Sequence, residues 1–233
     1  MNKAINREEL RQVLYKGRAD LMYVHGFYPD LEGWDPTWEQ RFTEMYGYDP
    51  AAAKRLLAEA GYPKGFKAKA WLYPFAGAPE LIPLVESIQI QLREIGIELE
   101  LEEADWVAAV RPKLRDRKAQ GYLLPLPPSK KAVESQLAFN TGKNILHQFE
   151  TDELYTMWEE LLQLTDPKAR DAQLRKIGNY KFENFEVIPL FNVYIEVIID
   201  PKIVADWPFP GWDGGDVGHT SLIQACKQEK PCR

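Results

Sequence analysis

Three carboxylic acids lie close together in the sequence, at Glu102, Glu103 and Asp105. Two carboxyl groups that share a pocket can act as the general acid and the general base of a hydrolase. That interpretation requires the carboxyl groups to converge and at least one of them to have a raised pKa. The alternative is a solvated turn at the end of a strand. We favour the solvated turn, so hydrolysis is our third hypothesis, behind a binding function and a purely structural one.

Other residues that could act in catalysis or metal binding are few, and their spacing matches no common catalytic or metal-binding motif. The chain has 3 histidines and 2 cysteines, and it lacks the GxSxG, GxGxxG, Walker, HExxH and CxxC signatures. Cys226 and Cys232 fit neither a zinc site nor a redox motif, and they either close a small tail loop or stay free. Asp213, Asp216 and His219 lie in a glycine-rich segment, where we prefer a solvated turn to a metal site. The sequence therefore predicts a binding protein rather than an enzyme, with no cofactor and no metal.

Length and composition are those of an ordinary globular protein. The 233 residues suffice for one large domain or two small ones, and 45% of them are hydrophobic and 27% charged. The net charge of −6 argues against a nucleic-acid partner held by bulk electrostatics. No apolar run approaches the roughly 20 residues that span a bilayer. The first residues lack the apolar stretch of a secretory signal, so the sequence read literally predicts a cytosolic protein.

Helix and strand patterns alternate along the chain. Asn6 and Asp49 are good N-caps, and the apolar stripes expected to face the core include Val13 and Leu56. The predicted helices cover residues 6–17, 49–61, 79–96, 106–118, 151–162 and 166–185. The predicted strands cover residues 66–73, 97–102, 121–124 and 186–199, and residues 18–48 are predicted to form an ordered, extended connection. Strands that alternate with helices pair in parallel through right-handed crossovers, so we predict an α/β fold with a mostly parallel mixed sheet flanked by helices.

The carboxyl ends of the predicted strands are the expected ligand site, as in other open α/β sheets. These ends carry aromatic and proline residues with few charges, which suits a ligand with apolar or sugar faces and a few hydrogen-bonding groups. The predicted ligand-binding residues are Tyr73, Phe75, Tyr122, Asn140 and Arg111. For Arg111 the two interpretations are a counter-ion for the ligand and a surface salt bridge.

One long motif resembles a known family. Residues 48–66 read YDPAAAKRLLAEAGYPKGF and closely resemble the YDPxxAKxLLxEAGYPxGF signature of the family 5 extracellular solute-binding proteins. These are the peptide, nickel and oligosaccharide receptors of bacterial ABC importers. Residues 4–10 resemble the AIxREEL helix of that family, and residues 92–99 resemble its LxxIGIxV step from helix to strand. The resemblance covers essentially the whole chain.

The resemblance implies a periplasmic-binding-protein-like (type II) lobe that is incomplete. Family members are longer, begin with a secretion signal and close two lobes around a ligand. On this interpretation residues 1–186 form the second lobe, and residues 187–233 form the return segment toward a missing first lobe and the C-terminal tail. The chain is then expected to be a truncated or partial product of a protein that is periplasmic, or lipid-anchored outside the membrane.

The implied function is that of the substrate-binding component of an ABC importer. Such a component captures a small solute (an oligopeptide, an oligosaccharide or a similar molecule) in a cleft between two lobes and delivers it to the permease transmembrane subunits. Residues 122–131 depart from the peptide-binding relatives, because they lack the acidic residue that pairs with a peptide's amino terminus. This departure argues against a generic peptide, and Lys130 and Lys131 either favour an anionic or polar ligand or are solvated. The alternative is a truncated interaction or structural domain without a transport function, which self-associates through an exposed aromatic patch.

Overall fold

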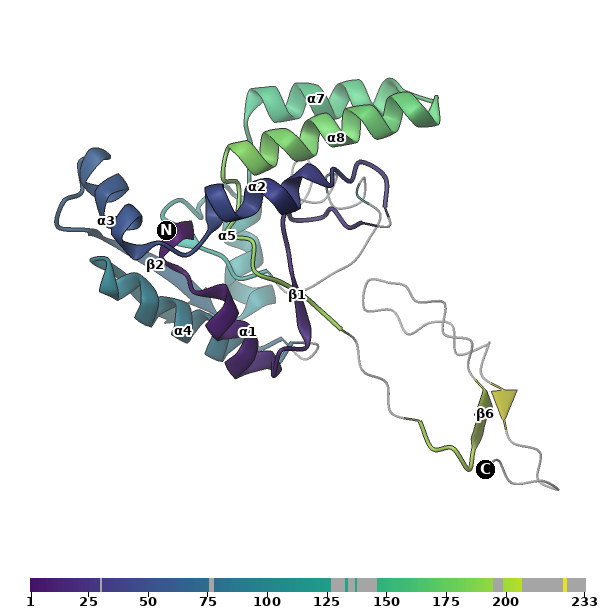
Figure 1. Cartoon of the computed structure of the whole chain (residues 1–233), viewed down its shortest axis with the longest axis horizontal. Helices are drawn as coiled ribbons and strands as arrows, with labels where there is room; N and C mark the ends of the chain where they lie inside the picture. The colour runs from purple at the N-terminus through teal and green to yellow at the C-terminus, as the bar shows by residue number, and fades with distance from the viewer. Residues whose placement is uncertain are drawn as a thin grey trace.

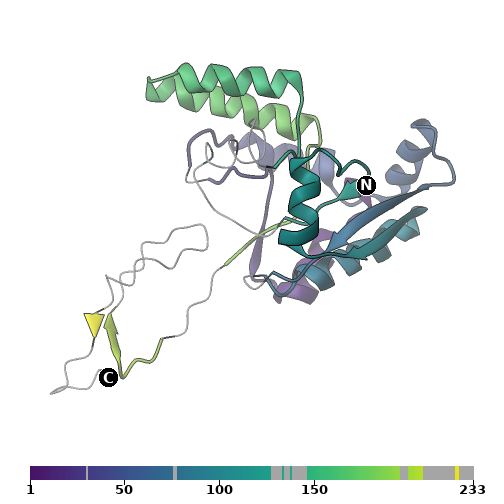
Figure 2. The same cartoon turned by 180° about the vertical axis from the view of Figure 1, so that it is seen from behind.

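The chain combines an α/β unit with a layer of helices (Figure 1). The computed structural model describes residues 1–29, 31–75, 78–126, 133, 137, 146–194, 199–206 and 224–225. Figure 2 shows the same arrangement from behind, with the helical layer along one side of the α/β unit. Within the described ranges, no helix combines the length and the apolar character that a membrane span requires.

A three-stranded sheet lies at the centre of the α/β unit. Its strands are β2 (Phe66–Leu72), β3 (Ile97–Glu103) and β4 (Tyr122–Leu123), in the order β3-β2-β4. Phe66 pairs with Ile97, and Lys69 pairs with Tyr122. Both pairings are parallel, which confirms the predicted α/β fold with a parallel sheet flanked by helices.

The two long strands begin side by side at a pair of glycines. Gly65 and Gly96 have positive φ angles of 77° and 91°, a conformation that costs other L-residues about 1–2 kcal/mol. A Cβ atom at Gly65 would lie 1.7 Å from the Gly96 carbonyl oxygen. The close approach of the two backbones explains why a glycine precedes each strand.

One face of the sheet shares an apolar core with three helices. They are α1 (Arg7–Tyr15), α3 (Pro50–Glu59) and α4 (Leu81–Glu94). The core contains Leu10, Leu57, Ala70, Leu84, Ile88, Leu92, Ile97 and Leu99. Val13 is 70% exposed and Leu56 is 52% exposed, so the prediction that these two residues face the core is wrong. Each lies beside a residue that does face the core in the helical repeat.

The N-cap predicted for α3 is confirmed and carries a testable consequence. Asp49 Oδ1 accepts a hydrogen bond from the Ala52 amide at 2.8 Å. Because this amide has no partner within the helix, we expect Asp49→Ala to lower the free energy of unfolding by about 1 kcal/mol. Asp49→Asn keeps an acceptor and should restore most of that loss in urea denaturation followed by circular dichroism. Equal losses in both variants would contradict a capping role.

The opposite face of the sheet is covered near the carboxyl ends of its strands. The covering elements are the π-helix η2 (Trp106–Val110) and the short helix α5 (Arg111–Arg115). They pack on a second core that includes Trp71, Tyr73, Val110 and Leu114. The helix predicted over residues 106–118 therefore exists in two pieces. Pro112 lies within the first two residues of α5, where a missing amide costs nothing.

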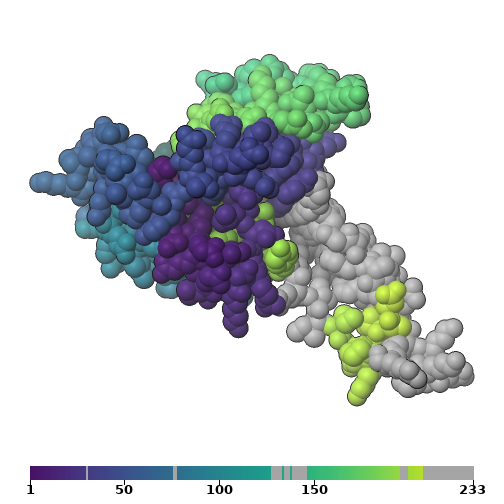
Figure 3. All heavy atoms as spheres, viewed as in Figure 1, coloured from purple at the N-terminus to yellow at the C-terminus, as the bar shows by residue number. Residues whose placement is uncertain are grey.

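A layer of three helices lies beside the α/β unit (Figure 3). They are α2 (Thr37–Tyr46), α7 (Asp152–Gln163) and α8 (Pro167–Glu183). Trp38, Phe42 and Tyr46 are buried in the core that α2 shares with α7 and α8. The extended connection predicted for residues 18–48 is therefore wrong from Thr37 onward. Its aromatic residues recur every four positions, which places them on one face of a helix.

The segment after α8 returns to the α/β unit. There β5 (Phe191–Val193) pairs antiparallel with β1 (Ala19–Leu21), and Phe191 joins the first core. The long strand predicted for residues 186–199 is thus too long, because among its described residues only these three form a strand. Elsewhere in the described ranges lie the 3-10 helix η1 (Asn2–Ala4) and an antiparallel pair of β6 (Val204–Asp206) and β7 (Gln224–Ala225).

Candidate functional site

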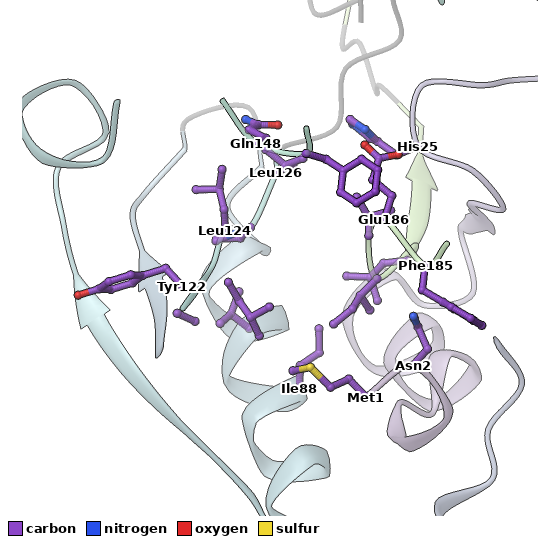
Figure 4. A pocket seen from close by; sticks show the side chains of 18 of the residues that line it. Met1, Asn2, His25, Ile88, Tyr122, Leu124, Leu126, Gln148, Phe185 and Glu186 are labelled. Carbon is purple, nitrogen blue, oxygen red and sulfur yellow. The ribbon is translucent and has the colours of Figure 1, made fainter. Parts of the chain in front are cut away.

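A cavity of about 910 Å³ lies beside β4, between α4 and the segment that follows α8 (Figure 4). Most of its lining is apolar and includes Met1, Ile88, Leu124, Leu126 and Ile188. The polar residues that Figure 4 labels on its walls are Asn2, His25, Gln148 and Glu186, besides Tyr122. Its size is in the range of small-molecule sites.

A buried ion pair between Lys181 and Glu186 lies at one wall of this cavity. Lys181 Nζ lies 3.0 Å from Glu186 Oε2, and the two side chains are only 2% and 3% exposed. Lys181 also donates a hydrogen bond to the His25 carbonyl oxygen at 3.1 Å. Burial raises the pKa of Glu186, and the Lys181 ammonium opposes that rise. The Lys181 ammonium is therefore the counter-ion of the buried Glu186 carboxylate.

His25 lies on the same wall, and its ring is neutral at physiological pH. Burial lowers the pKa of His25 to about 3, and the nearby Lys181 charge acts in the same direction. His25 and Glu186 both line this wall (Figure 4), but the Glu186 side chain is only 3% exposed and faces Lys181. The wall therefore holds one carboxylate and one imidazole in otherwise apolar surroundings.

The first two predicted ligand-binding residues, Tyr73 and Phe75, do not line the cavity. Tyr73 is buried, and its hydroxyl donates to the Pro125 carbonyl oxygen while its ring packs 5.2 Å from that of Trp106. Burial raises the pKa of the Tyr73 hydroxyl. Phe75 is 40% exposed just beyond the end of β2. Of these two side chains, Phe75 is the one that solvent reaches.

Tyr122 borders the cavity, but its hydroxyl points away from it (Figure 4). Its ring stacks on Trp71 with 4.2 Å between centroids. The hydroxyl donates to Glu102 Oε2 at 2.7 Å, and Lys113 Nζ lies 5.3 Å from the ring centroid. Tyr122 is therefore part of a packed aromatic and charged cluster on the sheet face.

The last two predicted ligand-binding residues, Arg111 and Asn140, are not placed at the cavity by any described contact. Arg111 is exposed at the start of α5 and forms no ion pair with any residue the structure describes. Asn140 lies outside the described residues. The predictions on Lys130, Lys131, Asp213, Asp216, His219, Cys226 and Cys232 also concern residues outside the described ranges.

The hydrolase hypothesis is wrong, because the three carboxylates do not form an acid–base pair. Glu102 is engaged by Tyr122, and this hydrogen bond lowers the pKa of Glu102 instead of raising it. Asp105 Oδ1 accepts from the Ala108 amide at 2.6 Å and caps η2. Glu103 is exposed. Each carboxylate thus has a separate structural environment.

The link between Tyr122 and Glu102 can be tested by titration. Tyr122→Phe removes the hydrogen bond that stabilises the Glu102 carboxylate, so the pKa of Glu102 should rise toward its ordinary value. Carbon-13 NMR of the side-chain carboxyl groups, recorded against pH, measures this shift. The control Tyr62→Phe changes an exposed tyrosine elsewhere and should leave the Glu102 titration unchanged. An unchanged pKa in Tyr122→Phe would contradict the assigned interaction.

Sequence reasoning missed Lys181 and Glu186, although one signal for Lys181 was present. Leu174, Ile177 and Lys181 recur at intervals of three and four on α8 and are all buried. A lysine on the apolar face of a helix indicates a buried partner, because an unpaired buried charge is costly. Nothing local in the sequence identifies that partner as Glu186.

Comparison with known proteins matches this chain to one family and to binding proteins from other bacteria. Residues 1–143 match the bacterial extracellular solute-binding proteins, family 5 Middle. Heme-binding protein A of Haemophilus influenzae is 25% identical over 183 residues, which are 76% of this chain and 32% of that protein. Glutathione-binding protein GsiB of Salmonella choleraesuis is 31% identical over 105 residues, which are 45% of this chain and 19% of that protein.

Solved structures with the same fold agree with this match. HbpA2 from Haemophilus parasuis superposes with a TM-score of 0.68 at 21% identity, over 82% of this chain and 37% of that chain. DppA from Helicobacter pylori, in complex with the peptide STSA, superposes with a TM-score of 0.64 at 24% identity. The superposition covers 82% of this chain and 36% of that chain. The fold is thus that of part of a periplasmic binding protein.

The chain spans about a third of the length of the curated relative that it matches over most of its residues. The family comprises binding proteins, in agreement with the prediction of a binding module rather than an enzyme. Because the family match covers more than half of the chain, this protein belongs to the bacterial extracellular solute-binding proteins of family 5.

Proposed function

We propose that this chain is the second lobe of the substrate-binding component of an ABC importer. The family match over residues 1–143 is the observation that carries the proposal. The structural likeness to DppA with a bound peptide supports it. In this role residues 1–186 form the lobe, and residues 187–233 lead toward a first lobe. The segment remains attached to the lobe at least through β5, because β5 pairs with β1. The protein would act in the periplasm, or outside the cell at the membrane.

The solute would bind at the carboxyl ends of the strands, against the first lobe. We place the contacts at Tyr73, Phe75, Tyr122, Arg111 and Asn140. The exposure of Phe75 supports a stacking role for this ring, and Arg111 offers a charge without a described ion-pair partner. Lobe closure would bury the aromatic surface and present a docking face to the permease transmembrane subunits.

The charge pattern near this end restricts the class of solute. Residues 122–131 contain no carboxylate, so a ligand ammonium there would be buried without a counter-ion. A polar or anionic solute, such as an oligosaccharide or a capped or acidic peptide, would avoid that cost. We therefore favour solutes of this kind over peptides with a free amino terminus.

NMR titration of the chain tests the proposal, because it detects weak binding to a single lobe. The panel includes the peptide STSA, its acetylated form, glutathione, hemin and a maltooligosaccharide. We expect one class to shift the amide signals of Phe75 and Tyr122 saturably, and Phe75→Ala to weaken that binding. The control Tyr48→Ala alters an exposed ring elsewhere and should have no effect. Amide signals that stay unchanged at millimolar concentrations of every compound would overturn the proposal.

A further inference from the structure

The outer side of β3 is an open edge of the parallel sheet. β3 is the first strand in the order β3-β2-β4, and no described strand pairs with its outer side. The Ala104 amide, just after β3, donates to the Leu72 carbonyl oxygen of β2 at 2.9 Å. Because successive residues of a parallel strand direct their peptide groups to opposite sides, Leu99 and Leu101 direct theirs away from β2. Such an open edge is a template for pairing with another chain.

One face of α4 lies along this edge. Gln89 donates from Nε2 to the Leu99 carbonyl oxygen at 2.6 Å, so its side of the helix borders the outer edge of β3. Ile82, Glu86 and Arg93 share that side, because they lie seven and three residues before Gln89 and four residues after it. Glu86 and Arg93 are exposed, and neither forms an ion pair with a residue that the structure describes.

The edge and this helix face are complementary to a second copy of themselves about a two-fold axis at Glu100. Antiparallel pairing of two β3 strands about that axis sets Leu99 of each copy opposite Leu101 of the other, where their outward peptide groups can exchange hydrogen bonds. The axis also passes near Gln89, because Gln89 reaches Leu99. It therefore brings Glu86 of each copy toward Arg93 of the other, and the opposite charges meet twice, as a two-fold contact requires.

One pair of like charges opposes this arrangement. Glu100 is exposed and forms no ion pair with any described residue, whereas its neighbour Glu98 pairs with Lys67 at 2.7 Å. At the axis the two Glu100 side chains would lie directly opposite each other on the same face of the joined sheet, where like charges are destabilising. Association through this edge should therefore be weak while both carboxylates are charged.

We infer that the outer edge of β3 is a self-association surface, at which a second copy of this chain adds its own β3 antiparallel and joins the two sheets into one. A second copy is the occupant because the helix face carries both charges of the pair that it would meet, at Glu86 and Arg93. This role goes beyond the proposed solute binding and is separate from it, since none of the edge residues is among the proposed solute contacts.

Sedimentation velocity at micromolar to millimolar concentrations measures the association. We expect weak association of the unmodified chain and an association about tenfold or more tighter for Glu100→Gln, because that substitution removes the like charges at the axis. In the Glu100→Gln background, Arg93→Glu and Glu86→Arg should each weaken association about tenfold or more. The control Glu94→Arg makes the same charge change as Glu86→Arg at an exposed position on another side of α4, and it should leave association unchanged.

Charge exchange distinguishes this two-fold contact from other modes of association. Glu86→Arg combined with Arg93→Glu in one chain should restore association, because each reversed charge again meets its opposite. An equimolar mixture of the two single variants should also associate, although neither does so alone. Amide hydrogen exchange tests the strand pairing itself. The Leu99 and Leu101 amides should exchange more slowly as the chain concentration rises, whereas the Glu100 amide, which faces β2, should not change.

Three outcomes would overturn the inference. In the first, Glu100→Gln is folded by circular dichroism but sediments as a monomer at millimolar concentration. In the second, association persists unchanged in Arg93→Glu, which would assign it to a different surface. In the third, the chain associates while the Leu99 and Leu101 amides gain no protection, which would exclude pairing through β3.

Discussion

Arg7→Ala is expected to destabilise the chain severely. The Arg7 side chain is buried, at 5% residue exposure, and connects three segments that are distant in sequence. It donates to the carbonyl oxygens of Pro189 at 2.7 Å, Tyr46 at 3.0 Å and Asn2 at 3.1 Å. Its guanidinium therefore holds the first helix, the end of α2 and the return segment together.

The expected loss of stability in Arg7→Ala follows from the carbonyl oxygens that would lose their hydrogen-bond donor. Each buried acceptor that loses its donor costs about 1–3 kcal/mol. Three such acceptors, plus the lost contact with the Phe42 ring 5.3 Å away, give an expected loss on the order of 5 kcal/mol. The whole stability of a domain is about 5–15 kcal/mol. Arg7→Ala should therefore leave a large unfolded fraction at room temperature.

Urea denaturation followed by circular dichroism measures this loss, and two variants serve as controls. Arg7→Lys keeps the charge but offers a single ammonium, which cannot reach three carbonyl groups in different directions, so it should recover only part of the stability. Arg11→Ala removes a neighbouring arginine whose partner is the exposed Glu8, and it should change stability little. A similar small effect for Arg7→Ala would show that water replaces its hydrogen bonds.

The elements with strong local signals were predictable from the sequence. The N-caps Asn6, Asp49 and Asp166 accept hydrogen bonds from the backbone three residues later, because that interaction needs no distant partner. The parallel order of the sheet followed from alternating strands and helices. The helix α2 was missed because proline and aromatic residues surround it, although Trp38 and Phe42 are spaced four apart.

The candidate site was less predictable, because its properties depend on tertiary contacts. The sequence placed Tyr73 at the carboxyl end of its strand, which is where it lies, but Tyr122 is the first residue of β4 and pairs with Lys69 in the middle of β2. It could not show that both hydroxyl groups are bonded within the protein, to Pro125 and Glu102. Likewise, the apolar run around Glu186 suggested a strand, whereas burial beside Lys181 decides the role of this carboxylate.

Lys181→Met is the second substitution with a large expected effect, because it leaves the buried Glu186 carboxylate without its counter-ion. Removing one partner of a buried ion pair typically costs about 3–5 kcal/mol. Burial already raises the pKa of Glu186 in the folded protein, and the loss of the ammonium should raise it further. A carboxyl group with a raised folded pKa destabilises the fold as pH rises through that pKa. The loss in free energy of unfolding caused by Lys181→Met should therefore be greatest at neutral pH. It should shrink as the pH falls toward about 4.3, the ordinary pKa of glutamate.

A double substitution separates loss of the pair from loss of packing. Lys181→Met combined with Glu186→Gln removes both charges while keeping the side-chain volumes similar, and it should recover most of the stability lost in Lys181→Met. Urea denaturation at neutral and mildly acidic pH measures all the variants. Recovery would show that the ion pair, rather than the shape of this wall, makes the buried charge of Glu186 tolerable. Equal deficits in the single and double variants, independent of pH, would instead assign the loss to packing of the Lys181 side chain against the Phe27 ring, whose centroid lies 5.8 Å from the ammonium.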